Sequence, residues 1–259
     1  MLRAHLLMLL TFAFFLGLSG SAAPLQNPAG SGPVALVIQY KCQPSQRVEF
    51  RRRLSRETLP HFEQLKSEGM LLEYHLLFSR YVDTNTWDAL ALLAFSSYEQ
   101  VARWRHVEAN MPAGLSEPLI AIVASIETYP VDLVRQAFSS KSAPTPVYFV
   151  IPYAYSVPTA AYLKYADDYV LPQFSGWMKE DVLSGYQLYL QRYTAGRPWD
   201  SLIVLKYKDD ESFGRREQVV AKVRAQLQSD AVWRAASENK QNLRIEKEAV
   251  IADELYARD

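Results

Sequence analysis

Histidine is the side chain best suited to proton transfer and metal ligation near neutral pH, and the 259-residue chain holds four histidines. They are His5, His61, His75 and His106. His75 stands in a β-rich segment, and it could act as a catalytic proton acceptor or as a ligand of a haem or a metal. A structural role, as a hydrogen-bonded core residue, stays open for the same histidine.

The sequence does not predict a metal centre built from protein side chains. Zinc needs three or four ligands, and the chain offers one cysteine, Cys42, and histidines without an H-x-x-x-H or H-x-x-E-H spacing. It also lacks G-x-S-x-G and G-x-G-x-x-G, so neither a serine nucleophile nor a dinucleotide cradle is indicated. We therefore predict no metal and no resident cofactor, with haem left open.

A second set of residues with chemical potential occurs twice in the chain. Arg80, Tyr81, Trp87 and Asp88 recur 112 positions later as Arg192, Tyr193, Trp199 and Asp200. Hairpins centred on residues 84 and 196 would place each arginine opposite the aspartate and each tyrosine opposite the tryptophan. Such cross-strand pairs contribute about 0.2–1 kcal/mol each and fix the register, which indicates a structural role. The alternative is an arginine that binds an anionic ligand while the aspartate positions it.

Positions that differ between the two copies are better candidates for a binding site. Residues 74, 76, 78 and 80 are nearly matched in the second copy and predict a core face, because alternate residues of a strand share one face. The opposite face differs between the copies and is polar and aromatic. From it we take these candidate ligand-binding residues: His75, Tyr81, Gln187, Tyr189 and Tyr193.

The duplication extends beyond these residues. Leu59-Pro60-His61-Phe62 aligns with Leu171-Pro172-Gln173-Phe174, and the match continues without a gap to Leu90 and Leu202. Each copy has the pattern βαββαβ. We predict an α+β fold of two tandem ferredoxin-like modules, over 34–129 and 146–259, joined by a linker over 130–145. Their antiparallel sheets would form a pseudo-dimeric α+β barrel.

The hydrophobic periodicity places the individual elements. In the first copy we expect strands over 34–41, 70–81, 87–95 and 119–128, and helices over 45–68 and from a capping box at 96–99. In the second copy we expect strands over 147–155, 182–193, 199–207 and 243–252, and helices over 159–179, from about 210, and over 229–240. Pro60 and Pro172 predict a kink at equivalent points of the first helices.

The first 23 residues have the pattern of a signal peptide: a basic start, an apolar run over 6–18 and small residues before a cleavage point. The apolar run is shorter than the ~20 residues that span a bilayer. After a flexible leader over 24–33, we expect a secreted or periplasmic protein that does not contact a membrane. The chain has 28 basic and 28 acidic residues. This balance indicates no extended positively charged surface that would bind the phosphate backbone of a nucleic acid.

The tandem βαββαβ pattern, the aromatic-rich helix ends and Trp233 in the last helical insertion resemble the dimeric α+β barrel superfamily. That group includes antibiotic-biosynthesis monooxygenases, EthD-like and NIPSNAP-like proteins, chlorite dismutases and dye-decolorising peroxidases. The resemblance covers residues 34–252 in topology and implies two facing four-stranded sheets. Because duplication supplies both halves, it also implies a monomer.

Three functions remain as hypotheses. The first is a protein that binds a small apolar or aromatic molecule between its two sheets, since 16 Tyr, 11 Phe and 5 Trp make stacking easy. The second is an oxidative enzyme, cofactor-independent or haem-dependent, that uses His75. The third is a structural scaffold without a pocket.

Overall fold

The computed structural model describes residues 34–141 and 143–256. The predicted signal peptide and leader, residues 1–33, lie outside the described residues. In the first half the chain forms β1 (Ala35–Cys42), η1 (Pro44–Gln46), α1 (Arg47–Arg53), η2 (Leu54–Thr58), α2 (Leu59–Ser67), β2 (Glu73–Ser79), β3 (Ala89–Ala94), α3 (Tyr98–Asn110), η3 (Pro112–Gly114), α4 (Glu117–Ile120) and β4 (Val123–Phe138).

The second half repeats this order with an additional helix and strand before the end. It forms β5 (Val147–Tyr155), α5 (Thr159–Tyr165), η4 (Ala166–Val170), α6 (Leu171–Lys179), β6 (Leu183–Gln191), β7 (Ser201–Tyr207), α7 (Asp210–Gly214), α8 (Arg216–Leu227), α9 (Ala231–Leu243), β8 (Arg244–Glu246) and β9 (Val250–Glu254).

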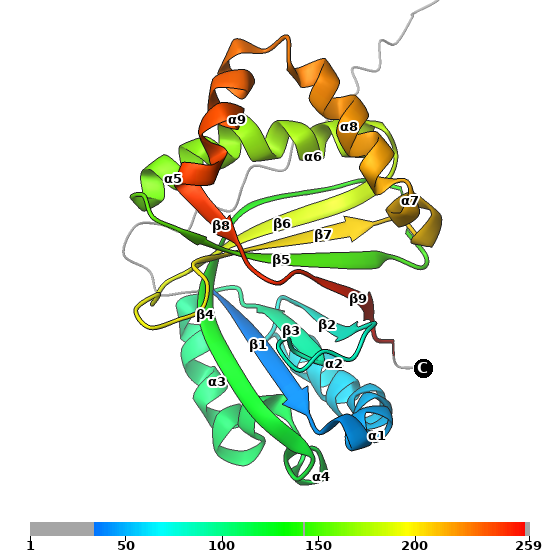
Figure 1. The fold of residues 1–259 in the computed structure, drawn as a ribbon. Coiled ribbons are helices and arrows are strands. Elements are labelled where there is room, and N and C mark those ends of the chain that lie inside the picture. The colour runs from blue at the N-terminus through cyan, green and yellow to red at the C-terminus, as the bar shows by residue number, and fades with distance from the viewer. Residues whose placement is uncertain (1–33, 142, 257–259) are drawn as a thin grey trace, which may run out of the picture.

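In the described part of the chain, eight strands close into an antiparallel barrel, with β8 added at β5. The first half contributes the order β4-β1-β3-β2, and the second half contributes β9-β5-β7-β6. The halves meet along two seams, where β4 pairs with β6 and β2 pairs with β9. Helices of each half cover the outer face of its own strands (Figure 1).

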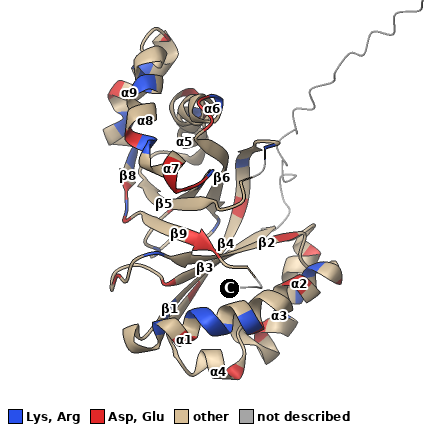
Figure 2. Cartoon of the chain, turned by 90° about the vertical axis from the view of Figure 1, so that its right-hand side faces the viewer, with Lys and Arg blue, Asp and Glu red and all other residues tan. Residues whose placement is uncertain are grey.

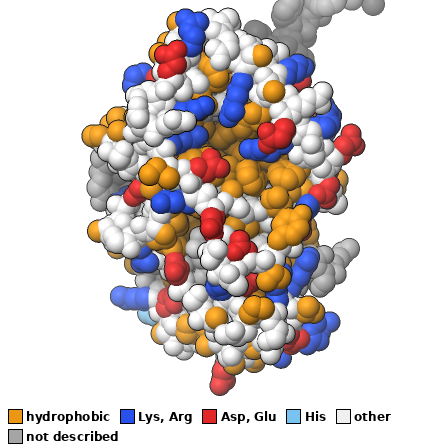
Figure 3. Space-filling model, viewed as in Figure 1, with side chains coloured by type: hydrophobic (Ala, Val, Ile, Leu, Met, Phe, Trp, Pro, Cys, Tyr) orange, Lys and Arg blue, Asp and Glu red, His pale blue; other side chains and the backbone are white. Residues whose placement is uncertain are grey.

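Alternation along the strands produces three hydrophobic cores, because successive side chains point to opposite faces. Leu36, Ile38 and Tyr40 of β1 face the helices of the first half. Ala35 and Val37 face the barrel interior, together with side chains from both halves. A third core lies between the helices and strands of the second half. Figure 3 shows hydrophobic side chains gathered there at the surface, bordered by charged ones.

The first helix of each half contains a π-helical segment at an equivalent place. These segments are η2 and η4, offset by 112 positions, and each is followed at once by Leu-Pro. Proline has no backbone N–H to donate. A wider helical turn just before it accommodates the missing bond. The sequence-predicted irregularity at Pro60 and Pro172 is therefore present as a π-helical turn.

Two local predictions were wrong. The predicted linker over 130–145 begins as strand, because β4 continues through Phe138 and pairs with β6 from Val131 onward. The β-rich stretch before the Ser- and Pro-containing segment is therefore part of the barrel wall. The second helix of the first half is capped by Ser97, whose side chain accepts from the N–H of Gln100, rather than by a box that starts at Ser96.

Each helix within residues 34–141 and 143–256 is too short or too polar to cross a lipid bilayer.

Candidate functional site

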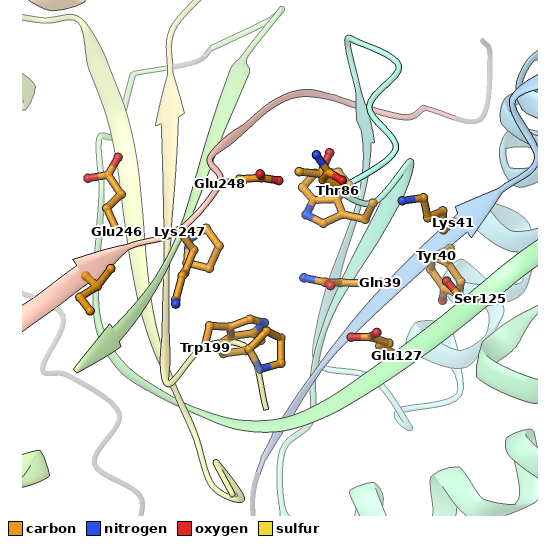
Figure 4. A pocket seen from close by; sticks show the side chains of 15 residues that line it. Gln39, Tyr40, Lys41, Thr86, Ser125, Glu127, Trp199, Glu246, Lys247 and Glu248 are labelled. Carbon is orange, nitrogen blue, oxygen red and sulfur yellow. The ribbon is translucent and has the colours of Figure 1, made fainter. Parts of the chain in front are cut away.

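A pocket of about 940 Å³ lies at the end of the barrel where both β-hairpins turn. Its lining comes from both halves, since it includes the ends of β1 and β5 and the segment between β8 and β9. Gln39 and Glu127 point into it from β1 and β4, and Glu248 points toward them from the other side (Figure 4). A pocket of this size is within the range of small-molecule sites.

Trp87 and Trp199, the two tryptophans of the repeated set, close the pocket toward the barrel interior. Both line the pocket and belong to the interior core. The ring of Trp199 lies 4.6 Å from that of Tyr129, centroid to centroid. The indole nitrogen of Trp199 is buried on the side of the Tyr129 hydroxyl. The floor of the pocket is thus aromatic.

The rim of the pocket is charged. It carries Lys41 and Lys247 together with Glu127, Glu246 and Glu248. The pocket can therefore hold a flat apolar body on its floor while polar groups at the rim fix its orientation.

Tyr129 links the floor of the pocket to this rim. Its hydroxyl donates to Glu127, and burial, with the charge of Glu127, holds the pKa of Tyr129 well above its ordinary value. The tyrosine is therefore neutral at physiological pH. It acts as a hydrogen-bond donor that positions the Glu127 carboxylate at the pocket.

The predicted hairpin pairing of Arg80 with Asp88 was wrong by one residue. Phe78 is opposite Ala89, and Ser79 donates its N–H to the carbonyl of Asp88. The second hairpin shows the same register, since the N–H of Gln191 donates to the carbonyl of Asp200. Because of this register, the predicted cross-strand pairs of tyrosine with tryptophan are also wrong. Trp87 and Trp199 point into the barrel, whereas Tyr81 and Tyr193 are exposed on the hairpins.

The repeated arginines join the two halves instead. Arg80 donates to Asp253 of β9 at 2.7 Å, across one seam. Arg192 donates to Asp132 of β4 at 2.9 Å, across the other. Each pair links a hairpin of one half to the last strand of the other. This gives the doubled arginine a structural role that within-hairpin reasoning could not find.

The repeated aspartates each satisfy a backbone N–H at the end of their half's first strand. Asp88 accepts from the N–H of Cys42 at 3.0 Å, and Asp200 accepts from that of Tyr155 at 2.9 Å. Both are thus anchored at the barrel end that carries the pocket. Their partners therefore differ from the predicted arginines.

The face predicted to bind ligand lies mostly inside the barrel, away from this pocket. His75, Gln187 and Tyr189 point to the interior side of β2 and β6, and the last two are buried. None of these three lines the barrel-end pocket, and neither Tyr81 nor Tyr193 does. The five predicted residues therefore do not come together at one cavity.

His75 is held between carboxylates near the start of β2. Its Nδ1 lies 2.6 Å from Glu254, and its Nε2 lies 3.4 Å from Glu73. Burial lowers the pKa of His75, but hydrogen bonds and charge from Glu254 and Glu73 outweigh burial and raise it to about 9. Glu254 also accepts from the hydroxyl of Tyr148 at 2.7 Å. The imidazole is therefore charged at neutral pH, and a charged imidazole cannot accept a proton.

A histidine that ligates haem iron needs a free ring nitrogen facing an open space. Both nitrogens of His75 face carboxylates, and His75 lines neither the barrel-end pocket nor the second pocket of the described structure. The chain has no histidine beyond His106, so the second half cannot supply one. His75 therefore does not fit the role of a haem ligand. No group of three or more metal-ligating side chains occurs within residues 34–141 and 143–256.

Sequence reasoning missed most of the pocket. The strand pattern of β1 carried a usable signal: Ala35 and Val37 face inward, so alternation also directs Gln39 and Lys41 to the inner face at the strand end. The contribution of residues 245–248 had no such signal, because it depends on where the segment after α9 crosses the barrel end.

No protein-family model matches the chain, and no curated protein matches it in sequence. Solved structures match over nearly their whole length. A candidate monooxygenase from Lactobacillus acidophilus NCFM has a TM-score of 0.54 at 11% identity, covering 86% of this chain and 94% of that one. An anthrone oxidase-like protein has a TM-score of 0.52 at 10% identity, covering 86% and 90%.

A further similar structure is chlorite dismutase from Candidatus Nitrospira defluvii, with a TM-score of 0.51 at 10% identity, covering 88% of this chain and 93% of that one. At these identities the likeness concerns the fold. These neighbours belong to the superfamily that the duplicated βαββαβ pattern resembles. The chain therefore has the dimeric α+β barrel fold.

Proposed function

We propose that this protein binds a small molecule with a flat apolar body in the barrel-end pocket. The observation that carries the proposal is the aromatic floor: Trp87 and Trp199 come from matching positions of the two halves and close one pocket of about 940 Å³. The charged groups of the rim would orient a polar group of the ligand. The scaffold hypothesis assumes a protein without a pocket and therefore does not account for this one.

We also infer that the barrel is a fused pair of ferredoxin-like modules. The matching strand orders of the two halves, the equal offset of η2 and η4, and the mirrored pairs Arg80–Asp253 and Arg192–Asp132 support this inference. The ligand would then lie between the halves at one end of the barrel. Export of the chain and a monomeric state remain predictions.

Binding is tested by calorimetric titration with anthrone, a planar three-ring ketone. Trp199→Leu should weaken binding roughly 2- to 12-fold, because an aromatic contact contributes about 0.5–1.5 kcal/mol beyond its area. Trp104→Phe is the matched control, since Trp104 lies in the helix-facing core of the first half. Equal affinity in all three proteins, or no heat with any of them, would contradict the proposal.

The fold neighbours favour an oxidative enzyme as the second candidate. With anthrone the balanced reaction is anthrone plus O2 to anthraquinone plus water: the methylene carbon loses two hydrogens and gains a carbonyl oxygen, and the other oxygen atom leaves as water. Glu127, held by Tyr129 at the pocket, is better placed to accept the methylene proton than His75, whose nitrogens both face carboxylates.

Oxygen uptake with anthrone distinguishes the two candidates. A binding protein leaves the oxygen concentration unchanged relative to buffer. An oxygenase consumes one O2 for each anthraquinone formed, loses activity in Glu127→Gln and keeps it in His75→Gln. Activity lost only in His75→Gln would instead restore the histidine as the base. Visible spectroscopy of protein from a haem-replete culture checks the cofactor, and we expect no haem absorbance.

A further inference from the structure

A second pocket, of about 590 Å³, lies on the outside of the barrel between α1, the end of β2 and β9. We call it the arginine groove, because Arg47, Arg51, Arg52 and Arg80 line it beside a single carboxylate, that of Asp253. Figure 2 shows the basic run on α1 from the side. The groove shares no lining residue with the barrel-end pocket.

Three of the four guanidinium groups are held in place by carboxylates. Arg47 donates to Asp88 at 2.8 Å. Arg80 donates to Asp253 at 2.7 Å. Arg52 pairs with Glu49 on the same helix.

Arg51 differs from the other three arginines. No carboxylate pairs with it in the described part of the chain, and its guanidinium lies 5.5 Å from the centre of the Phe78 ring. The groove therefore presents one fork of donors that is not neutralised, beside arginines whose positions are fixed. Such a fork matches a carboxylate or phosphate.

The remaining surface of the groove is apolar. Phe78 lies at its base and is buried. Val48 and Val82 line it with 85% and 62% of their surface exposed. Two such exposed valines beside a free guanidinium fit a ligand that carries both an oxyanion and an aliphatic body.

The groove also contains an unsatisfied hydroxyl. Ser55 lines it within the π-helical segment η2, is 2% exposed, and its Oγ has no hydrogen-bond partner among the described residues. Buried polar atoms without partners are rare and call for an explanation. A ligand oxygen at the base of the groove would provide the missing partner.

The equivalent place in the second half has lost these features. With the offset of 112 between η2 and η4, Arg47, Arg51 and Ser55 correspond to Thr159, Leu163 and Asp167. Asp167 is bound in a bidentate pair by Arg135, with both distances at 2.8 Å. A general requirement of the fold would apply to both halves, so Arg51, which pairs with no carboxylate among the described residues, is not explained by folding.

We propose that the arginine groove binds a small organic carboxylate with an aliphatic body. Arg51 holds the carboxylate, and Phe78, Val48 and Val82 contact the aliphatic part. The proposal is independent of the barrel-end site.

The test is calorimetric titration with octanoate, with octan-1-ol as the uncharged probe of equal chain length. Arg51→Leu places in the first half the residue that the second half already carries, on an exposed helix position where folding should persist. We expect it to weaken octanoate binding roughly 10- to 100-fold, as for the loss of a charge-assisted pair. Arg51→Lys should be intermediate, because lysine keeps the charge but loses the fork.

Arg103→Gln is the control for net charge, since Arg103 is an exposed, paired arginine on α3. Three results would overturn the proposal: unchanged octanoate affinity in Arg51→Leu, equal losses in Arg51→Leu and Arg103→Gln, or equal affinity for octanoate and octan-1-ol. Binding of inorganic sulfate as tight as that of octanoate would also contradict it, because the aliphatic contacts would then contribute nothing. Far-UV circular dichroism of each variant establishes that the comparison is between folded proteins.

Discussion

The free energy of unfolding should depend on pH through the protonation of His75, and replacing this residue should remove that dependence. His75 sits on the seam between β2 and β9, with Glu254 of β9 at 2.6 Å and Glu73 of its own strand at 3.4 Å. Tyr148 of β5 also faces this group, and the Lys206 ammonium lies 5.5 Å from the Tyr148 ring. The charged imidazole thus compensates carboxylates that belong to different halves of the barrel.

The sign and size follow from the two protonation equilibria. The pKa of His75 is about 9 in the folded protein and 6.5 without its partners. Below pH 6.5 the imidazole is charged in both states, so the full contribution is present. Between pH 6.5 and 9 the unfolded chain loses the proton first, and the contribution declines as the pH rises through 9. The difference between the two pKa values of His75 corresponds to about 3 kcal/mol of unfolding free energy.

Urea unfolding at several pH values between 6 and 9 measures this difference. The wild-type free energy of unfolding should fall by about 3 kcal/mol more over that range than that of His75→Gln. His106→Gln, at a histidine of the helix α3, serves as the matched control and should follow the wild type. Parallel curves for wild type and His75→Gln would refute the reasoning, and so would a wild-type stability that rises with pH through this window.

Two further predictions concern the seam and the thiol. A double-mutant cycle on Arg192 and Asp132 should give a coupling energy of about 1 kcal/mol. This should exceed the coupling energy of the exposed pair Arg103–Glu99, because the seam pair is partly buried. Equal coupling energies would show that the seam pair stabilises the fold no more than a surface pair does. Burial and a neighbouring aspartate raise the pKa of Cys42 to about 12 from 9.0, so a disulfide reagent at pH 8 should react roughly a thousandfold slower with the native protein than in urea. Similar rates in both conditions would show that the thiol is accessible and ionised.

Much of the fold could be predicted from the sequence because it rests on local periodicity. The second copy shows this best: the predicted strand over 147–155 coincides with β5, and the predicted helix over 159–179 spans α5 through α6. The predicted core face of β2 packs with the helices at Leu76, whereas the opposite face, predicted to line a ligand cavity, packs in the barrel interior at Leu77.

The hairpin partners and the pocket depended on features that local patterns do not contain. A shift of one residue in the hairpin register moves Arg80 from Asp88 to Asp253, which lies more than 160 residues further along the chain. Nothing near Arg80 in the sequence marks that partner. The pocket likewise needs the closure of the barrel, which brings the end of β1 beside the segment after β8.

The strand β4 has a consequence for how a ligand reaches the interior. Its sixteen residues pair first with β1 and then with β6, so the chain that leaves the first half is still part of the barrel wall through Phe138. These pairs hold the two halves together along the seam between β4 and β6. Trp87 and Trp199 line the barrel-end pocket, so a ligand reaches the tryptophan floor from that end. Substitutions there should change association rates before they change the stability of the fold.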